Sequence, residues 1–293
     1  MKRSANIFLL SLPSLLWLLI FYALPVFIVF LFAFRTSDAY GGIGDKWTLD
    51  TVRNLFSPGF SAVIWRTVWL GVVSTALSIV IAVPIAYHLA KMSPKLRNIV
   101  LMLIIVPFWT NFLIRIFAWK VFLNPEGILR RTLVLIGLIP EETMLLYNQW
   151  AVLAVMVYTY LPYAILPIYA AAEKFDFALL DAAKDLGASS FQGFRKVFLP
   201  SISKSIWVAV MVVLIPALGA YLIPDLVGGP TSEMMGDRIA QSVFTERNLP
   251  RASALSALLM ITVFLPLLLM TALKWIFGKD DEKEESRTMG ARS

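Results

Sequence analysis

Six segments of the 293-residue chain are apolar for long enough to cross a bilayer as helices, which takes about 20 residues each. They cover residues 7–34, 63–90, 99–122, 151–172, 206–222 and 252–277. Hydrophobic residues make up 59% of the chain and charged residues only 15%, too few polar groups to cover the surface of a soluble protein. We therefore predict an all-α integral membrane protein with six transmembrane helices in a single domain, residues 1–293.

Basic residues indicate which side of the membrane the loops face. The link between the second and third segments carries Lys91, Lys95 and Arg97 and no acid, and two basic residues follow the first Met. Short loops of this kind stay on the cytoplasmic side. Six spans bring both ends to one side, so we expect both termini, with the tail 278–293, in the cytoplasm. The net charge of +7 fits this distribution, and no binding to nucleic acid is expected.

Residue types that serve catalysis or metal binding are scarce. The chain has no Cys and one His, His88, near the inner end of the second segment, where we expect an interfacial side chain. We therefore predict no metal site and no thiolate nucleophile. The sequence lacks the Gly-x-x-x-x-Gly-Lys-Ser/Thr loop that binds nucleotide phosphates. No catalytic residue and no cofactor is predicted in this chain, which is expected not to be an enzyme.

The link between the fourth and fifth segments, residues 175–200, has the pattern of two short helices joined by a turn. The first would end at Gly187 in a left-handed conformation. The second would begin at a capping box of Ser189 and Gln192 and end at Pro200. Each helix would carry one apolar face: Leu179, Ala182, Ala183 and Leu186 on the first, and Phe191, Phe194 and Phe198 on the second. The spacing also fits an ordinary amphipathic elbow at the membrane surface.

The same segment contains a spaced motif, Asp181-Ala182-Ala183, then Gly187, then Val197-x-Leu199-Pro200. It resembles the EAA motif of binding-protein-dependent ABC importer permeases, with Asp181 in place of the usual Glu and Val197 in place of Ile. The resemblance implies the type I importer permease fold and a cytoplasmic elbow that docks into an ATPase subunit. The residues expected to couple to that subunit are Asp181, Ala182, Ala183, Gly187, Leu199 and Pro200.

Other segments narrow the resemblance. The stretch from Pro107 to Ile116 in the third segment, and the stretch from Tyr221 to Gly229 after the fifth, are similar to those of spermidine/putrescine importer permeases, in particular the first of their two permease subunits. Spermidine and putrescine are flexible polycations, and aromatic rings and carboxylates can bind their ammonium groups. The residues that we expect along the substrate path are Trp109, Asn111, Arg115, Tyr158, Tyr221 and Asp225. Two alternatives remain: Arg115 could snorkel or pair with a helix, and Asp225 could cap a helix or pair with Arg238.

The resemblance also implies an assembly in the bacterial inner membrane. Its expected members are a second homologous permease in a heterodimer, two ATP-binding cassette subunits that bind ATP and Mg, and an extracytoplasmic binding protein. Transport would proceed by alternating access. A permease for another solute (an anion, iron or thiamine) is the first alternative, and Arg115 in the path would favour an anion. A stand-alone secondary transporter is the second, but the spans show no mid-membrane acid or inverted repeat.

Overall fold

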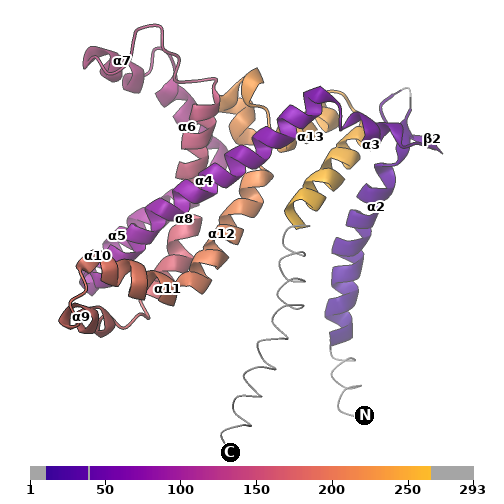
Figure 1. Cartoon of the computed structure of the whole chain (residues 1–293). Coiled ribbons are helices and arrows are strands. Elements are labelled where there is room, and N and C mark those ends of the chain that lie inside the picture. Colours follow the sequence, from indigo (N-terminus) through magenta and orange to yellow (C-terminus); the bar gives the residue numbers. More distant parts are fainter. Residues whose placement is uncertain (1–10, 39, 265–293) are drawn as a thin grey trace, which may run out of the picture. The chain divides into compact units, whose positions relative to one another are not determined.

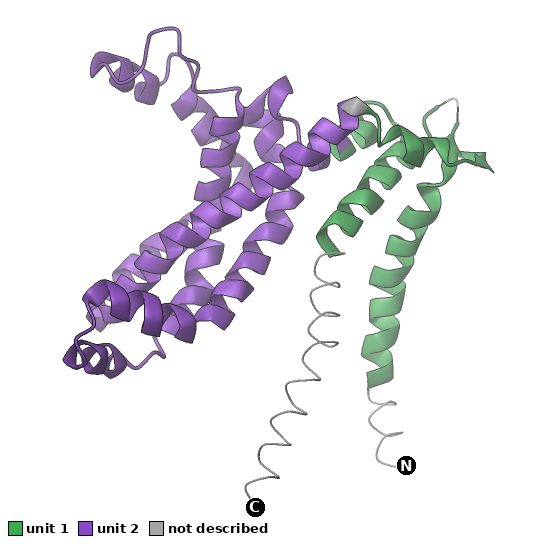
Figure 2. Cartoon of the chain, viewed as in Figure 1, with its two compact units in different colours: residues 1–57, 239–293 green, residues 58–238 purple. Residues whose placement is uncertain are grey.

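The computed structural model describes residues 11–38 and 40–264 of the chain. The described part is mostly helical, as the composition predicts (Figure 1). Contacts between residues divide the chain into two compact units, residues 58–238 and residues 1–57 with 239–293 (Figure 2). The start of the first predicted span (residues 7–10), the end of the last one (residues 265–277) and the predicted tail 278–293 lie outside the described part.

The unit of residues 1–57 and 239–293 begins with an apolar helix and continues into a small hairpin. The helix, Ser11–Phe32, fits the first predicted span, and another apolar helix, Leu249–Phe264, begins the last one. The labelled elements are η1 (Leu19–Ala23), α2 (Leu24–Phe32), β1 (Arg35–Ser37), β2 (Ile43–Trp47) and α3 (Asp50–Asn54). The two antiparallel strands are a short departure from the all-helical prediction.

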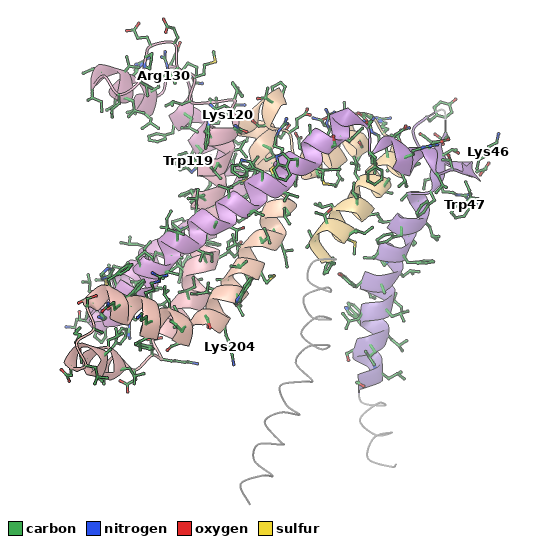
Figure 3. The ribbon with its side chains drawn as sticks, viewed as in Figure 1. Lys46, Trp47, Trp119, Lys120, Arg130 and Lys204 are labelled. Carbon is green, nitrogen blue, oxygen red and sulfur yellow. The ribbon has the colours of Figure 1, made fainter. Side chains whose placement is uncertain are left out.

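Local chemistry explains why this hairpin forms. The Asp38 carboxylate accepts hydrogen bonds from the backbone N–H groups of Tyr40 (2.8 Å) and Gly42 (2.6 Å), which closes the turn. The Arg35 guanidinium lies 4.8 Å from the centre of the Trp47 ring on the facing strand. Figure 3 shows Trp47 on this hairpin.

Three helices form the core of the unit of residues 58–238. They are α4 (Pro58–Lys91), α8 (Gln149–Ala172) and α12 (Ser203–Leu218), and each packs on the other two. Alanines at their contacts are fully buried, namely Ala82, Ala86, Ala164, Ala209 and Ala217. Small side chains of this kind let helices approach closely in lipid, where apolar burial alone gives little drive for association.

Buried polar groups in this core find partners inside the helices. The Ser78 and Thr75 hydroxyls donate to carbonyl oxygens one turn earlier, at 2.7 Å each. The Tyr160 hydroxyl of α8 donates to the carbonyl oxygen of Pro216, near the end of α12, at 3.2 Å. A helix end leaves carbonyls without an intrahelical partner, so this bond helps to close α12 within the packed core.

The predicted third span, 99–122, is divided in the structure. It forms α5 (Pro94–Trp109) and α6 (Phe112–Leu123), and the chain bends by 97° between them. Asn111 stabilises the start of α6 after the break, because its side-chain oxygen accepts from the N–H of Leu113 at 2.8 Å. The helix α7 (Ile128–Leu135) follows α6 in the chain. The elements that follow α12 are η3 (Pro224–Gly228), η4 (Pro230–Ser232) and α13 (Met235–Phe244).

Within the described residues, three unbroken helices are long and apolar enough to cross a membrane. Two bent pairs add up to two more candidate spans: α5 with the α6–α7 stretch, and the helix ending at Ser201 with α12. The helix of the fifth predicted span ends at Leu218, four residues earlier than expected. The helical and membrane character of the chain is therefore clear, and the number of six spans stays a prediction.

The close contact of α8 with its neighbours predicts that Ala164→Leu destabilises the protein. The added side chain has no space at a fully buried position, and overpacking of this kind costs about 1–3 kcal/mol. We expect a lower midpoint of thermal unfolding for the variant in nanodiscs. Ala154→Leu, an exposed position on the same helix, is the control and should leave the midpoint unchanged.

Candidate functional site

Residues 175–200, which we call the elbow, form two short helices and a tight turn. The elements are α9 (Ala178–Asp185), α10 (Ser190–Gly193), η2 (Phe194–Phe198) and α11 (Leu199–Ser201). As predicted, Gly187 is left-handed, with φ of +87°, and its N–H donates to the Lys184 carbonyl oxygen at 2.8 Å. The N–H of Ala188 donates to Ala183 at 3.0 Å, which completes a Schellman motif and stops α9.

The second helix begins as predicted and ends one residue after the predicted position. Ser189 and Gln192 form a full capping box: the N–H of Gln192 donates to the Ser189 hydroxyl oxygen at 3.2 Å, and the N–H of Ser189 donates to the Gln192 side chain at 2.8 Å. The helical stretch ends at Ser201, one residue after Pro200, and the chain then bends by 69° into α12. This agrees with the predicted end at Pro200 to within one residue.

An aromatic cluster attaches the elbow to α4. Its members are Tyr87, Phe175, Phe177, Phe194 and Phe198. The Tyr87 ring, from α4, lies edge-on to Phe198 at 4.9 Å and to Phe194 at 5.2 Å between ring centres. Phe198 has no exposed surface. Edge-to-face pairs of this kind add to the stabilisation from burial, so the cluster holds the elbow at a defined angle to the helix core.

Lys91 adds to this attachment, whereas Arg97 joins α5 to α8. Lys91 Nζ lies 4.2 Å above the Tyr87 ring and donates to its hydroxyl. Arg97, at the start of α5, forms an ion pair with Glu173, at the end of α8, at 3.0 Å. The sequence pattern indicated Lys91 and Arg97 only as charges that set orientation. Their contacts, and the role of Tyr87, depend on residues far away in the chain, so no local signal identified them.

The outward face of the elbow is apolar and exposed. Leu186 exposes 90% of its surface, and Leu179 and Phe191 are also exposed, whereas Leu180 is buried against the second helix. Asp181 pairs with Lys184 at 2.9 Å on this face, and the ammonium group lowers the pKa of the Asp181 carboxyl. Ala182 is exposed and Ala183 is partly so. An apolar surface bordered by charges is suited to contact with another protein.

The residues expected along the substrate path lie in separate places. Arg115 and Tyr158 line an open pocket of about 360 Å³ together with Trp119 and Phe122, and the Trp119 and Tyr158 rings are 5.2 Å apart. Figure 3 shows Trp119 on α6. The Arg115 guanidinium lies 5.4 Å from the Phe108 ring. Sequence reasoning missed Trp119, because its partner ring comes from α8.

The other predicted path residues do not line this pocket. Trp109 exposes 82% of its surface beside the break, and Asn111 is occupied as the cap of α6. Tyr221 and Asp225 lie after the end of α12, and both are exposed. Arg238 forms an ion pair with Glu233 at 2.7 Å, and no ion pair in the described part of the chain includes Asp225.

Comparison with protein families identifies the chain. Residues 74–278 match the model of the binding-protein-dependent transport system inner membrane component. The chain belongs to this permease family.

Curated relatives and solved structures agree with this family. The spermidine/putrescine transport system permease protein PotB of Haemophilus influenzae is 37% identical over 86% of this chain and 88% of its own length. PotB of Escherichia coli is 34% identical over 92% of this chain and 98% of its own. A bacterial ABC transporter structure, described as importing the polysaccharide alginate, matches with a TM-score of 0.74 at 20% identity, over 93% of this chain and 96% of the other. The chain is therefore an ABC importer permease subunit.

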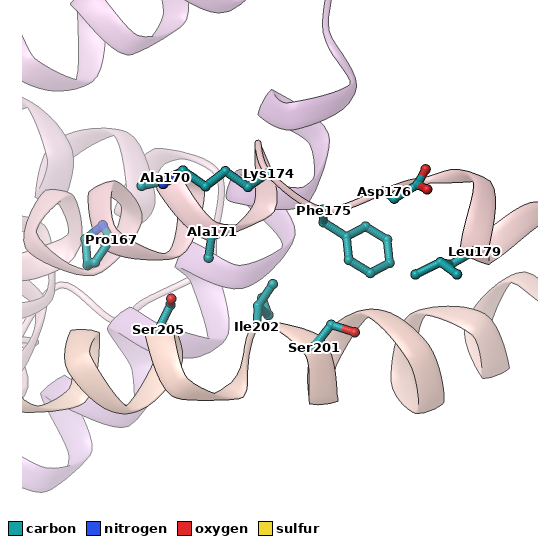
Figure 4. Close-up of a pocket in the computed structure, with 10 residues that line it drawn as sticks. All are labelled: Pro167, Ala170, Ala171, Lys174, Phe175, Asp176, Leu179, Ser201, Ile202 and Ser205. Atoms are coloured by element: carbon teal, nitrogen blue, oxygen red, sulfur yellow. The ribbon is translucent and has the colours of Figure 1, made fainter.

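An open pocket separates the permease elbow from the helix core on one side (Figure 4). It has a volume of about 530 Å³ and lies between the end of α8 and the start of α12. Lys174 and Asp176 line it from one chain segment, and Ser201 and Ser205 line it from the other. The elbow is thus packed tightly on the side of the aromatic cluster and loosely on the side of this pocket.

The left-handed turn of the elbow predicts that Gly187→Ala uncouples ATP hydrolysis from transport. A Cβ at Gly187 meets no atom within 4 Å, so the penalty is backbone strain, about 1–2 kcal/mol at a positive φ. We expect the variant importer to move less solute for each ATP hydrolysed in proteoliposomes.

Gly137→Ala is a matched control, because Gly137 also has a positive φ (+72°) and open space around its Cβ but lies after α7, outside the elbow. It should keep normal coupling. Normal coupling in Gly187→Ala as well would show that the elbow does not depend on this turn.

Proposed function

We propose that the chain is one of two homologous permease subunits of an importer for the polyamines spermidine and putrescine. The observation that carries the proposal is the 37% identity to PotB over 86% of the chain. Identity at this level extends over both the elbow and the stretch after α12, rather than over one motif. The second of these stretches holds Asp225, an exposed carboxylate that suits a polycation.

The rest of the importer follows from the same proposal. Two ATP-binding cassette subunits bind ATP and Mg, and an extracytoplasmic binding protein delivers the substrate. One of the solved relatives is described as an alginate transporter in complex with a periplasmic protein, which is consistent with such a partner. In this arrangement the chain crosses the bacterial inner membrane six times with both termini in the cytoplasm, and the elbow faces the cytoplasm. The chain itself performs no catalysis and needs no cofactor.

The exposed face of the elbow is the surface that we assign to the ATPase. Leu179, Ala182 and Leu186 offer small and apolar contacts, and the Asp181 carboxylate lies beside them. Closure of the ATPases would move the elbow, and the aromatic cluster would carry this motion into α4. The Arg97–Glu173 ion pair would pass it to α5 and α8. Alternating access would follow because packed helices shift as rigid elements.

An anion importer is the second candidate, and one observation favours it. The Arg115 guanidinium lines the pocket beside Trp119, and its Nε is buried without a hydrogen-bond partner among the described residues. An anionic group would satisfy that donor. The arrangement also permits a structural role, since Arg115 lies near the faces of Phe108 and Phe112.

Uptake by the reconstituted importer distinguishes these candidates. We expect proteoliposomes that contain the permease pair, the ATPases and the binding protein to accumulate labelled spermidine and putrescine when ATP is supplied. An excess of sulfate, ferric iron or thiamine should not compete. Transport of one of these solutes in place of polyamines would contradict the proposal.

The exposed carboxylate at Asp225 predicts a loss of uptake in Asp225→Asn. If the group lies on the path, removal of its charge should lower the rate of spermidine uptake several-fold, because a charge-assisted contact with ammonium is lost. Glu141→Gln, an exposed acid in the loop after α7, serves as the control and should transport normally. An unchanged rate in Asp225→Asn would remove this residue from the path.

A further inference from the structure

The pocket behind the elbow has both polar and apolar walls. Lys174, just after α8, lines it on one side, and Ser205, in the first turn of α12, lines it on the other. Figure 4 shows the Lys174 side chain lying back along α8 toward Ala170, and the Ser205 hydroxyl pointing from α12 toward α8. Most of the remaining wall is apolar and consists of Pro167, Ala170, Ala171, Phe175, Leu179 and Ile202. A ligand that fits this pocket must therefore carry a polar group and apolar atoms together.

The polar groups that face this pocket favour an anion. Among the described residues, neither the Lys174 ammonium nor the Ser205 hydroxyl takes part in an ion pair or a hydrogen bond. The Asp176 carboxylate also lines the pocket, but it accepts from the N–H of Ala178 at 3.0 Å and points away from α12 (Figure 4). An ammonium group and a hydroxyl group that face one pocket can both donate to the same anionic oxygen group.

An exposed apolar strip continues from the pocket along α12. Val208, Val212 and Ile215 follow Ser205 at intervals of three and four residues, so these side chains lie on one face of the helix. All three apolar residues are exposed. From Ser205 to Ile215 the strip is roughly 15 Å long at 1.5 Å per residue, about half of the ~30 Å apolar core of a bilayer. The strip thus has the length of one leaflet.

A polar pocket at the end of such a strip matches a phospholipid better than a free anion. In the proposed orientation the elbow faces the cytoplasm, so the pocket lies at the level of the cytoplasmic headgroups, where anionic lipids bind basic pockets between helices. Lys204, the residue before Ser205, is exposed and adds a second positive charge (Figure 3). We infer that the pocket binds an anionic phospholipid of the cytoplasmic leaflet, with its phosphate at Lys174 and Ser205 and an acyl chain along α12. This inference rests on the proposed orientation and not on the polyamine substrate.

Titration of the purified importer with phosphatidylglycerol tests this site, with native mass spectrometry to count the lipids bound to this subunit. We expect Lys174→Gln to weaken the binding of one lipid about tenfold, the size of one lost charge-assisted contact. Ser205→Leu should also weaken it, because the larger side chain fills the pocket and removes a donor. Lys174→Arg keeps the charge and should bind as wild type. Lys95→Gln, an exposed lysine in the first turn of α5 on the same side of the membrane, is the matched control and should leave binding unchanged.

Other occupants of this surface give different outcomes. Phosphatidylcholine, which has no net charge, should bind more weakly than phosphatidylglycerol, and inorganic phosphate should not displace the lipid. Displacement by inorganic phosphate would indicate a site for free anions and overturn the inference. Unchanged lipid binding in Lys174→Gln and Ser205→Leu would overturn it as well, and loss of the second permease subunit from these variants would then identify the strip as a subunit interface.

Folding and transport are measured separately. Lys174 is exposed, so Lys174→Gln should keep the wild-type midpoint of thermal unfolding, which excludes misfolding as the cause of weaker lipid binding. Uptake of spermidine is a different measurement on the wild-type importer. A failure of the lipid site therefore leaves the polyamine proposal intact, and a failure of polyamine uptake leaves the lipid site intact.

Discussion

The burial of Phe198 against Tyr87 is the contact that fixes the elbow to the helix core. The elbow has few other ways to hold its angle, since its outward face is exposed and a pocket of about 530 Å³ lies behind it. An elbow fixed only by its two chain connections would move independently of the helix core. The edge-on contacts of Tyr87 with Phe198 at 4.9 Å and Phe194 at 5.2 Å oppose this, because a rotation of η2 must displace the Tyr87 ring of α4 as well.

The core of the unit of residues 58–238 combines closely packed helices with a few interruptions of helices. Alanines at the contacts of α4, α8 and α12 bring the backbones together and resist repacking. The breaks lie where side chains can satisfy the freed backbone groups, as Asn111 does at the start of α6 and Tyr160 does near the end of α12. Backbone polar groups without partners are costly in lipid, so such breaks mark the few places where the bundle can change direction.

Local features of this chain could be predicted from its sequence, and contacts between distant segments could not. The turn at Gly187 and the capping box at Ser189 are set by residues within a few positions, and both form as expected. Tyr87 and Trp119 carried no local signal. Each acquires its place from a side chain that only the fold brings near. The helix end at Pro200, which depends on the proline itself, was predicted to within one residue.

The helix α12 runs from the elbow to the first turn of α13. It begins at the 69° bend that follows the elbow. With 16 residues it spans roughly 24 Å at 1.5 Å per residue, and Pro216 near its end is accommodated without a break. A packed helix moves as one body, so a displacement at its elbow end changes the position of its other end relative to α13. The contact at Gly236 leaves no slack for that displacement, since the carbonyl oxygen of Ala220 lies where a side chain would be. A displacement of the elbow end of α12 would therefore be expected at its other end as well, where α13 begins.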